Sequence, residues 1–116
     1  MTSAGALVLA GGGHSHALLL KRWAMRPQHR PDRRIVLVNR LGSALYSGMV
    51  PAMIAGLEQQ KNVEIDLRQL CDRAGAAFVQ AEICGVDLGR QLLQLSDRPD
   101  LPYALLSLDV GAVSRG

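Results

Sequence analysis

Residues 11–16 carry the types and spacing that most clearly allow chemistry: three glycines followed by two histidines around a serine. They read Gly11-Gly12-Gly13-His14-Ser15-His16. Glycine admits a tight turn and lets an anion approach backbone N–H groups. An apolar run precedes the glycines and an apolar, helix-forming segment follows them, so the turn would lie at the positive end of a helix. This order predicts a pyrophosphate-binding turn of the type Gly-x-Gly-x-x-Gly, with histidine in place of the third glycine.

The two histidines also allow a different chemistry. Together with Ser15 or Asp109, His14 and His16 would suit metal-assisted hydrolysis, because histidines two apart can be adjacent metal ligands on a strand. Here they straddle a turn and the start of a helix. We therefore interpret both as residues that shape the turn, and we expect no metal site.

A second apolar run, residues 35–38, follows a helix-length segment and a proline-rich turn. Residues 6–39 therefore predict a βαβ unit of about thirty residues. The second strand should end in an acid that binds a ribose, but it ends in Asn39 and Arg40. Asn39 can hydrogen-bond a ribose hydroxyl, and Arg40 can equally hold a phosphate. A dinucleotide site is the favoured interpretation, and a glycine-rich turn that serves only packing is the alternative.

The rest of the chain predicts further elements of an α/β domain. Asp66 suits a helix N-cap and Gly75 a helix end. Residues 41–56 predict a loop followed by a brief helix. From the pattern alone, this segment could equally be a loop that covers a ligand or a simple surface connection. The expected elements are a helix over 14–25, a helix over 62–75, a strand over 77–81, a hairpin over about 82–95, a loop over 97–102 and a strand over 103–111.

Composition and charge limit the classes of protein to which the chain can belong. The chain has 116 residues, of which 48% are hydrophobic, enough for the core of one compact domain. Without a bilayer-length apolar run or a signal-like amino terminus, we expect a soluble, cytoplasmic protein. Cys71 and Cys84 form no CxxC pair, so we predict two buried thiols and no disulfide.

Basic residues are concentrated in one segment. Seven of the thirteen lie between Lys21 and Arg40, where Asp32 is the only acid. A nucleic-acid surface is one interpretation, but aromatic residues are missing apart from Trp23. We favour a solvated turn at the end of the sheet opposite the cofactor, and we expect no nucleic-acid partner.

Four motifs carry a resemblance to a known family. They are residues 11–16, Tyr46-Ser47-Gly48-Met49-Val50-Pro51, Ile65-Asp66-Leu67-Arg68 and Leu106-Ser107-Leu108-Asp109-Val110-Gly111. With the order of elements, they resemble the amino-terminal part of flavoproteins of the pyridine nucleotide-disulfide oxidoreductase type, near type II NADH dehydrogenases and sulfide:quinone reductases. More narrowly, they are similar to the branch fused to selenide, water dikinase, in which a histidine after the glycines is usual.

The resemblance implies a fold and a cofactor. The fold would be α/β, a Rossmann-like FAD/NAD(P)-binding fold with three layers, built from a parallel sheet and a small antiparallel hairpin. Residues 1–116 would be a truncated FAD-binding domain, with the NAD(P)H domain and the carboxy-terminal part absent. The fused selenide, water dikinase domain and a membrane-surface contact would belong to the full-length protein. The paired redox cysteines of the disulfide reductases are absent from this stretch.

The resemblance also implies roles for particular residues. Residues 11–16 would hold the FAD pyrophosphate, Asn39 and Arg40 would face the adenosine ribose, and the backbone from Ala81 to Ile83 would border the adenine. Two further positions follow from the motifs. Ser47 and Gly48 would lie on the cofactor side of their loop. Gly111 would occupy the place of the glycine in the family's Ala-Thr-Gly strand end, where Asp109 and Val110 replace the first two residues.

The implied function is that of an FAD-dependent oxidoreductase. In the full-length protein, electrons would pass from NAD(P)H through FAD to a quinone or another acceptor, and the flavin would supply the chemistry. The 116-residue chain alone would be inactive. The alternative is a nucleotide-binding or nucleotide-sensing domain without turnover.

Overall fold

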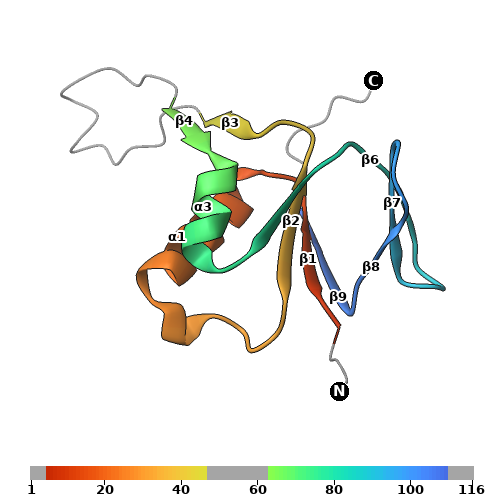
Figure 1. Cartoon of the computed structure of the whole chain (residues 1–116), viewed down its shortest axis with the longest axis horizontal. Coiled ribbons are helices and arrows are strands. Elements are labelled where there is room, and N and C mark those ends of the chain that lie inside the picture. The colour runs from red at the N-terminus through yellow and green to blue at the C-terminus, as the bar shows by residue number, and fades with distance from the viewer. Residues whose placement is uncertain (1–4, 47–62, 110–116) are drawn as a thin grey trace.

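The computed structural model describes residues 5–46 and 63–109. The elements alternate between strand and helix in the first half and are mostly strands in the second (Figure 1). The helices are α1 (His14–Met25), the short 3-10 helix η1 (Pro27–His29) and α3 (Leu67–Ala74). The strands are β1 (Leu7–Ala10), β2 (Ile35–Asn39), β3 (Ser43–Tyr46), β4 (Val63–Asp66), β5 (Ala77–Gln80), β6 (Ile83–Asp87), β7 (Leu92–Leu95), β8 (Leu101–Pro102) and β9 (Leu105–Leu108).

The central layer is a parallel sheet with the strand order β5-β2-β1-β9. The register pairs Leu9 with Leu37 of β2 on one side and with Ser107 of β9 on the other. In chain order these parallel strands read 3-2-1-4, as in a doubly wound dinucleotide-binding fold. β1 and β2 are buried because both faces of the sheet are covered, which explains their continuous apolar runs. The predicted α/β fold is therefore confirmed.

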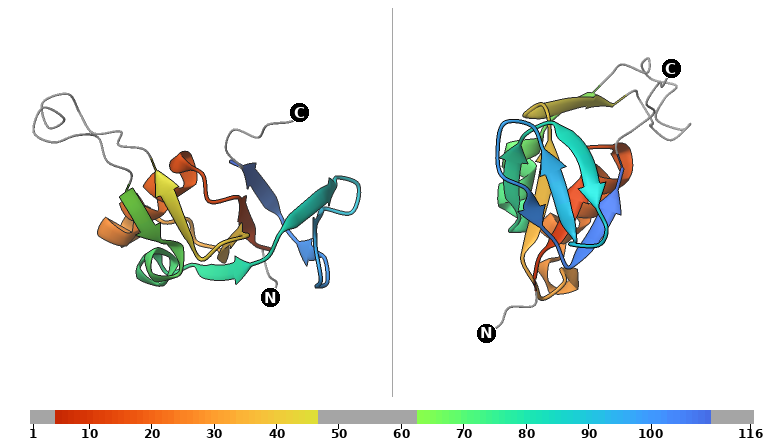
Figure 2. Two further views of the ribbon diagram at one scale, coloured as in Figure 1. Left: turned by 90° about the horizontal axis from the view of Figure 1, so that it is seen from above. Right: turned by 90° about the vertical axis from the view of Figure 1, so that its right-hand side faces the viewer.

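The helices α1 and α3 cover one face of the sheet (Figures 1 and 2). The core on this side includes Leu20 and Trp23 of α1, Leu67 and Cys71 of α3, and Leu37 of the sheet. α1 has the predicted bounds and ends just before Pro27, which cannot continue a helix.

A small antiparallel sheet of β6, β7 and β8 forms the third layer, on the opposite face (Figure 2). Leu93 and Leu95 of β7 pack against Val36 and Val38 of β2 in a second core. The predicted hairpin is confirmed in β6 and β7, and the three layers agree with the expected architecture. The predicted loop over 97–102 is wrong at its end, because β8 adds a short strand that pairs with β7.

The helix predicted over 62–75 is too long. Residues 63–66 form β4, which pairs antiparallel with β3. The two helix-end signals are nevertheless confirmed. Asp66 caps α3 by accepting a hydrogen bond from the backbone N–H of Gln69 at 3.0 Å, and Gly75 closes the helix in the left-handed conformation, φ +75°.

The segment predicted as a loop with a brief helix, 41–56, lies only partly within the described residues. Its beginning contains β3, which the sequence did not predict. Ser47 and Gly48, the brief helix and Gly111 lie outside the described residues.

The segment rich in basic residues lies at one end of the parallel sheet. η1 and the residues up to β2 lie at the amino ends of the parallel strands, opposite the glycine turn, as expected (Figure 1).

Cys71 is buried, but Cys84 is exposed on β6, so the prediction of two buried thiols is wrong for Cys84. Both thiols are free.

Candidate functional site

The site lies where the strand order reverses. β1 has β2 on one side and β9 on the other, and the chain leaves the carboxyl ends of β1 and β9 at Gly11 and Asp109. In open α/β sheets the crevice at this reversal is the usual ligand site. The glycine stretch found in the sequence therefore occupies the position at which this fold binds ligands.

Each of the three glycines is required by a different feature of the turn. Gly11 has a φ of +99°, a conformation that other residues rarely adopt. A Cβ on Gly12 would lie 2.8 Å from the Leu67 side chain, and one on Gly13 would lie 2.6 Å from the backbone oxygen of Asp109. A side chain at Gly13 would therefore collide with backbone, and one at Gly12 would require Leu67 to move.

The backbone N–H groups of the turn bond mostly within the protein. Those of Gly11 and Gly13 donate to the carbonyl oxygens of Val38 and Asp109, at 2.8 and 3.0 Å. Within the described residues, the backbone N–H of Ser15, in the first turn of α1, has no acceptor. A donor at the positive end of the helix is therefore available to an anion.

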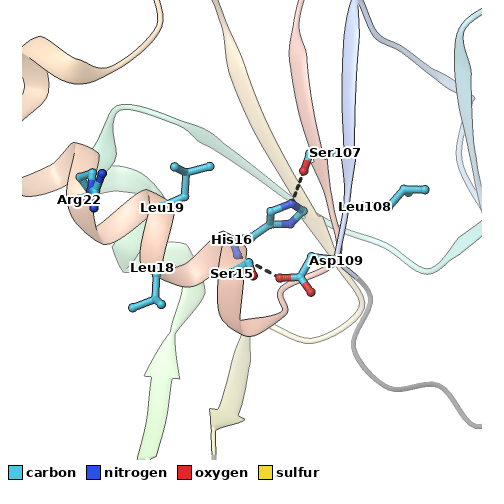
Figure 3. A pocket seen from close by; sticks show the side chains of 8 residues that line it. All are labelled: Ser15, His16, Leu18, Leu19, Arg22, Ser107, Leu108 and Asp109. Carbon is cyan, nitrogen blue, oxygen red and sulfur yellow. Dashed lines mark hydrogen bonds between the residues drawn. The ribbon is translucent and has the colours of Figure 1, made fainter. Parts of the chain in front are cut away.

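His16 connects three elements at this site. Its side chain is 2% exposed, its Nδ1 lies 2.8 Å from the carbonyl oxygen of Gly11, and its Nε2 lies 2.8 Å from Oγ of Ser107 (Figure 3). A carbonyl oxygen only accepts, so Nδ1 carries a proton and donates to Gly11. The histidine that replaces the third glycine thus joins the start of α1 to the end of β1 and to β9 by hydrogen bonds.

Asp109 approaches the same helix end from β9. Its Oδ2 accepts a hydrogen bond from the backbone N–H of His16 at 3.1 Å (Figure 3). Ser15, His16, Ser107 and Asp109 line an open hollow of about 590 Å³ beside α1, together with Leu18, Leu19, Arg22 and Leu108.

Asn39, the residue at the position of the ribose-binding acid, supports the glycine turn. Its Oδ1 accepts from the backbone N–H of Gly12 and its Nδ2 donates to the carbonyl oxygen of Leu41, both at 2.9 Å. Because one partner only donates and the other only accepts, the orientation of the amide is fixed. Its second N–H and the remaining lone pair on its oxygen are the capacity left for a ligand.

Five of the predicted residues line one pocket of about 260 Å³ beyond the ends of β1, β2 and β5. They are Gly11, Asn39, Arg40, Ala81 and Ile83. The backbone N–H of Ala81 donates to the carbonyl oxygen of Asn39 at 2.9 Å, which joins the two strand ends that form the pocket.

Sequence reasoning missed what the side chains of three residues do at the site. Glu82 lines the pocket beside Arg40, so its walls carry both charges. Leu67 limits the space at Gly12, and Ser107 holds His16. The contacts of Leu67 and Ser107 span large sequence separations, which no local pattern reveals.

No group of three or more His, Cys, Asp or Glu side chains that could hold a metal ion is found among the described residues. No helix in the described part of the chain is long and apolar enough to cross a membrane.

Comparison with known proteins identifies the fold. No protein-family model matches the sequence, and no curated protein matches it. The sulfide:quinone oxidoreductase from the hyperthermophilic bacterium Aquifex aeolicus matches with a TM-score of 0.64 at 16% identity, over 90% of this chain and 24% of that one. Putidaredoxin reductase, in its covalent complex with putidaredoxin, matches with a TM-score of 0.56 at 18% identity, over 99% and 28%. The chain has a Rossmann-like fold that two oxidoreductases share, and it spans about a quarter of their length.

Proposed function

We propose that this chain is the FAD-binding part of a flavoprotein oxidoreductase, and that the full-length protein passes electrons from NAD(P)H through FAD to a quinone or another acceptor. The observation that carries the proposal is the glycine turn at the reversal of the strand order, next to the pocket at the ends of β2 and β5. The fold likeness to two oxidoreductases supports it.

The residues present fit a dinucleotide in this position. The turn at Gly12 and Gly13 packs against Leu67 and Asp109 without side chains of its own, and the N–H of Ser15 next to it is open to a pyrophosphate. Asn39 and Arg40 would then face the adenosine ribose, and the backbone from Ala81 to Ile83 would border the adenine.

The chain's own contribution would be placement. When bound, FAD supplies the capacity to accept a hydride and pass electrons onward. The protein positions the adenosine half of the cofactor through the turn and the pocket, and His16 holds the turn in shape through Gly11 and Ser107. In this proposal the segments that enclose the flavin ring, the NAD(P)H domain and any fused selenide, water dikinase domain belong to further parts of a longer protein.

Titration of the 116-residue chain with FAD and adenine nucleotides tests the proposal. We expect weak FAD binding that ADP competes away, because only the adenosine half of the cofactor meets its site. Losing about 4 kcal/mol of contacts weakens affinity by roughly a thousandfold, so the chain should purify largely without flavin. A full-length protein should be yellow and should reduce an artificial acceptor with NADH or NADPH.

Two results separate the proposal from its alternative. A full-length protein that binds ADP but neither FAD nor an electron acceptor would favour the nucleotide-sensing domain. A 116-residue chain that binds neither ADP nor FAD would contradict a nucleotide site in this chain altogether.

A further inference from the structure

Asp109 places a carboxylate at the positive end of α1, on the turn where the proposed function puts a pyrophosphate. Its Oδ2 accepts from the backbone N–H of His16, and its carbonyl oxygen accepts from the N–H of Gly13. The Asp109 side chain also packs against Gly13, so closely that a Cβ there would meet it. The carboxylate is therefore held against the first turn of the helix by contacts on both sides.

The helix end thus already has an anion of its own. A carboxylate near a helix N-terminus is favoured by the exposed N–H groups and by the helix dipole. A phosphate oxygen bonded to the N–H of Ser15 would use the donor next to the one that Asp109 occupies. The two negative charges would then lie about 5 Å apart, since adjacent donors in the first turn of a helix point in similar directions.

We infer that Asp109 limits the affinity of this site for phosphate-bearing ligands, acting as an internal anion that a bound pyrophosphate must tolerate or displace. This inference rests on the proposed function. Two unit charges about 5 Å apart repel enough to weaken affinity about fourfold in bulk water, and more than a hundredfold at the effective dielectric constant of about 20 near a protein surface, so we expect an effect of at least about tenfold. Removing the charge from Asp109 should therefore strengthen the binding of ligands that carry phosphate.

Asp109→Asn separates charge from structure. The amide oxygen can still accept from the N–H of His16, and asparagine caps helices about as well as aspartate. We expect the variant to keep its fold, to bind ADP about tenfold more tightly than the parent, and to bind AMP with a smaller gain. Adenosine, which has no phosphate, should bind both proteins equally. Calorimetric titration of the 116-residue chain at physiological ionic strength measures all three.

Asp100→Asn is the matched control. Asp100 lies in the exposed loop before β8, so the substitution makes the same change in net charge away from the site. It should leave ADP affinity unchanged. An equal gain in both variants would show a general effect of net charge and overturn the inference.

The remaining outcomes are also decisive. If Asp109→Asn binds ADP as the parent does or more weakly, Asp109 does not oppose the ligand, and the inference fails while the nucleotide site stands. If neither the parent nor the variants bind ADP, the nucleotide site fails and the inference with it.

Discussion

Restoring the third glycine of the dinucleotide signature should destabilise this protein. The substitution is His16→Gly, and His16→Ala measures the loss of the side chain alone. In both variants the carbonyl oxygen of Gly11 and the hydroxyl of Ser107 lose a partner that lies at 2.8 Å. The imidazole, 2% exposed, leaves a cavity behind it.

The magnitude follows from these contacts. Two hydrogen bonds contribute about 1 kcal/mol each, and the cavity adds roughly 1–2 kcal/mol. We therefore expect His16→Ala to lower the free energy of unfolding by about 3 kcal/mol. Glycine in a helix costs up to about 1 kcal/mol more than alanine, so His16→Gly should be the less stable of the two.

Urea unfolding, followed by far-UV circular dichroism, measures the effect. With a slope of about 1–1.5 kcal/mol per molar urea, the midpoint should fall by roughly 2–3 M. Ser15→Gly is the control, because it places glycine in the same turn of the helix at an exposed position. If His16→Gly were as stable as the parent, the hydrogen bonds and burial of His16 would contribute nothing to stability.

Other predictions concern the helix cap, the thiols and the turn. Asp66→Ala should lower the free energy of unfolding by about 1 kcal/mol in the same assay, because α3 loses the N-cap bond seen in the structure. In the native chain a thiol reagent should label exposed Cys84 quickly and buried Cys71 slowly, and equal rates would contradict the burial of Cys71. Burial raises the pKa of the Cys71 thiol from 9.0 to about 12, with the charge of Arg68 acting in the opposite direction. As the pH rises, the Cys71 thiol ionises in the unfolded chain before it ionises in the folded one. The stability that comes from burying the neutral thiol is therefore complete below pH 9 and is lost between pH 9 and about pH 12. This effect should lower the free energy of unfolding by about 1.4 kcal/mol at pH 10 relative to pH 7, and Cys71→Ala should abolish that loss. Gly13→Asp should abolish ADP binding, because even a Cβ there would meet Asp109, and ADP affinity equal to that of the parent would refute the role given to the turn.

Local signals were enough to predict the parallel sheet and its helices. Continuous apolar runs marked β1 and β2, Pro27 marked the end of α1, and Asp66 and Gly75 marked the ends of α3. The prediction failed where pairing is not local. β4 ends at Asp66, which is also the N-cap of α3, so the residues of β4 were interpreted as part of the helix. Only its pairing with β3 makes it a strand.

The site was predicted in the same uneven way. Gly11, Asn39, Arg40, Ala81 and Ile83 line one pocket. The first three were expected from the spacing of the dinucleotide signature, and the last two only from the family resemblance. The sequence showed that His16 departs from the dinucleotide signature. It could not show what the histidine does, because its partner Ser107 lies 91 residues further along the chain. The exposure of Cys84 was also beyond a composition argument, since it depends on which face of β6 points outward.

The position of β9 beside β1 has a consequence for the order in which the protein folds. The bonds of His16 to Ser107 and to Asp109 close loops of 91 and 93 residues. Contacts between such distant parts of a chain form late, because the entropy of loop closure is lost before they stabilise anything. During synthesis, β1, α1 and β2 emerge from the ribosome long before β9 exists. The glycine turn is therefore made well before β9, yet it takes its final form only when β9 has docked beside β1.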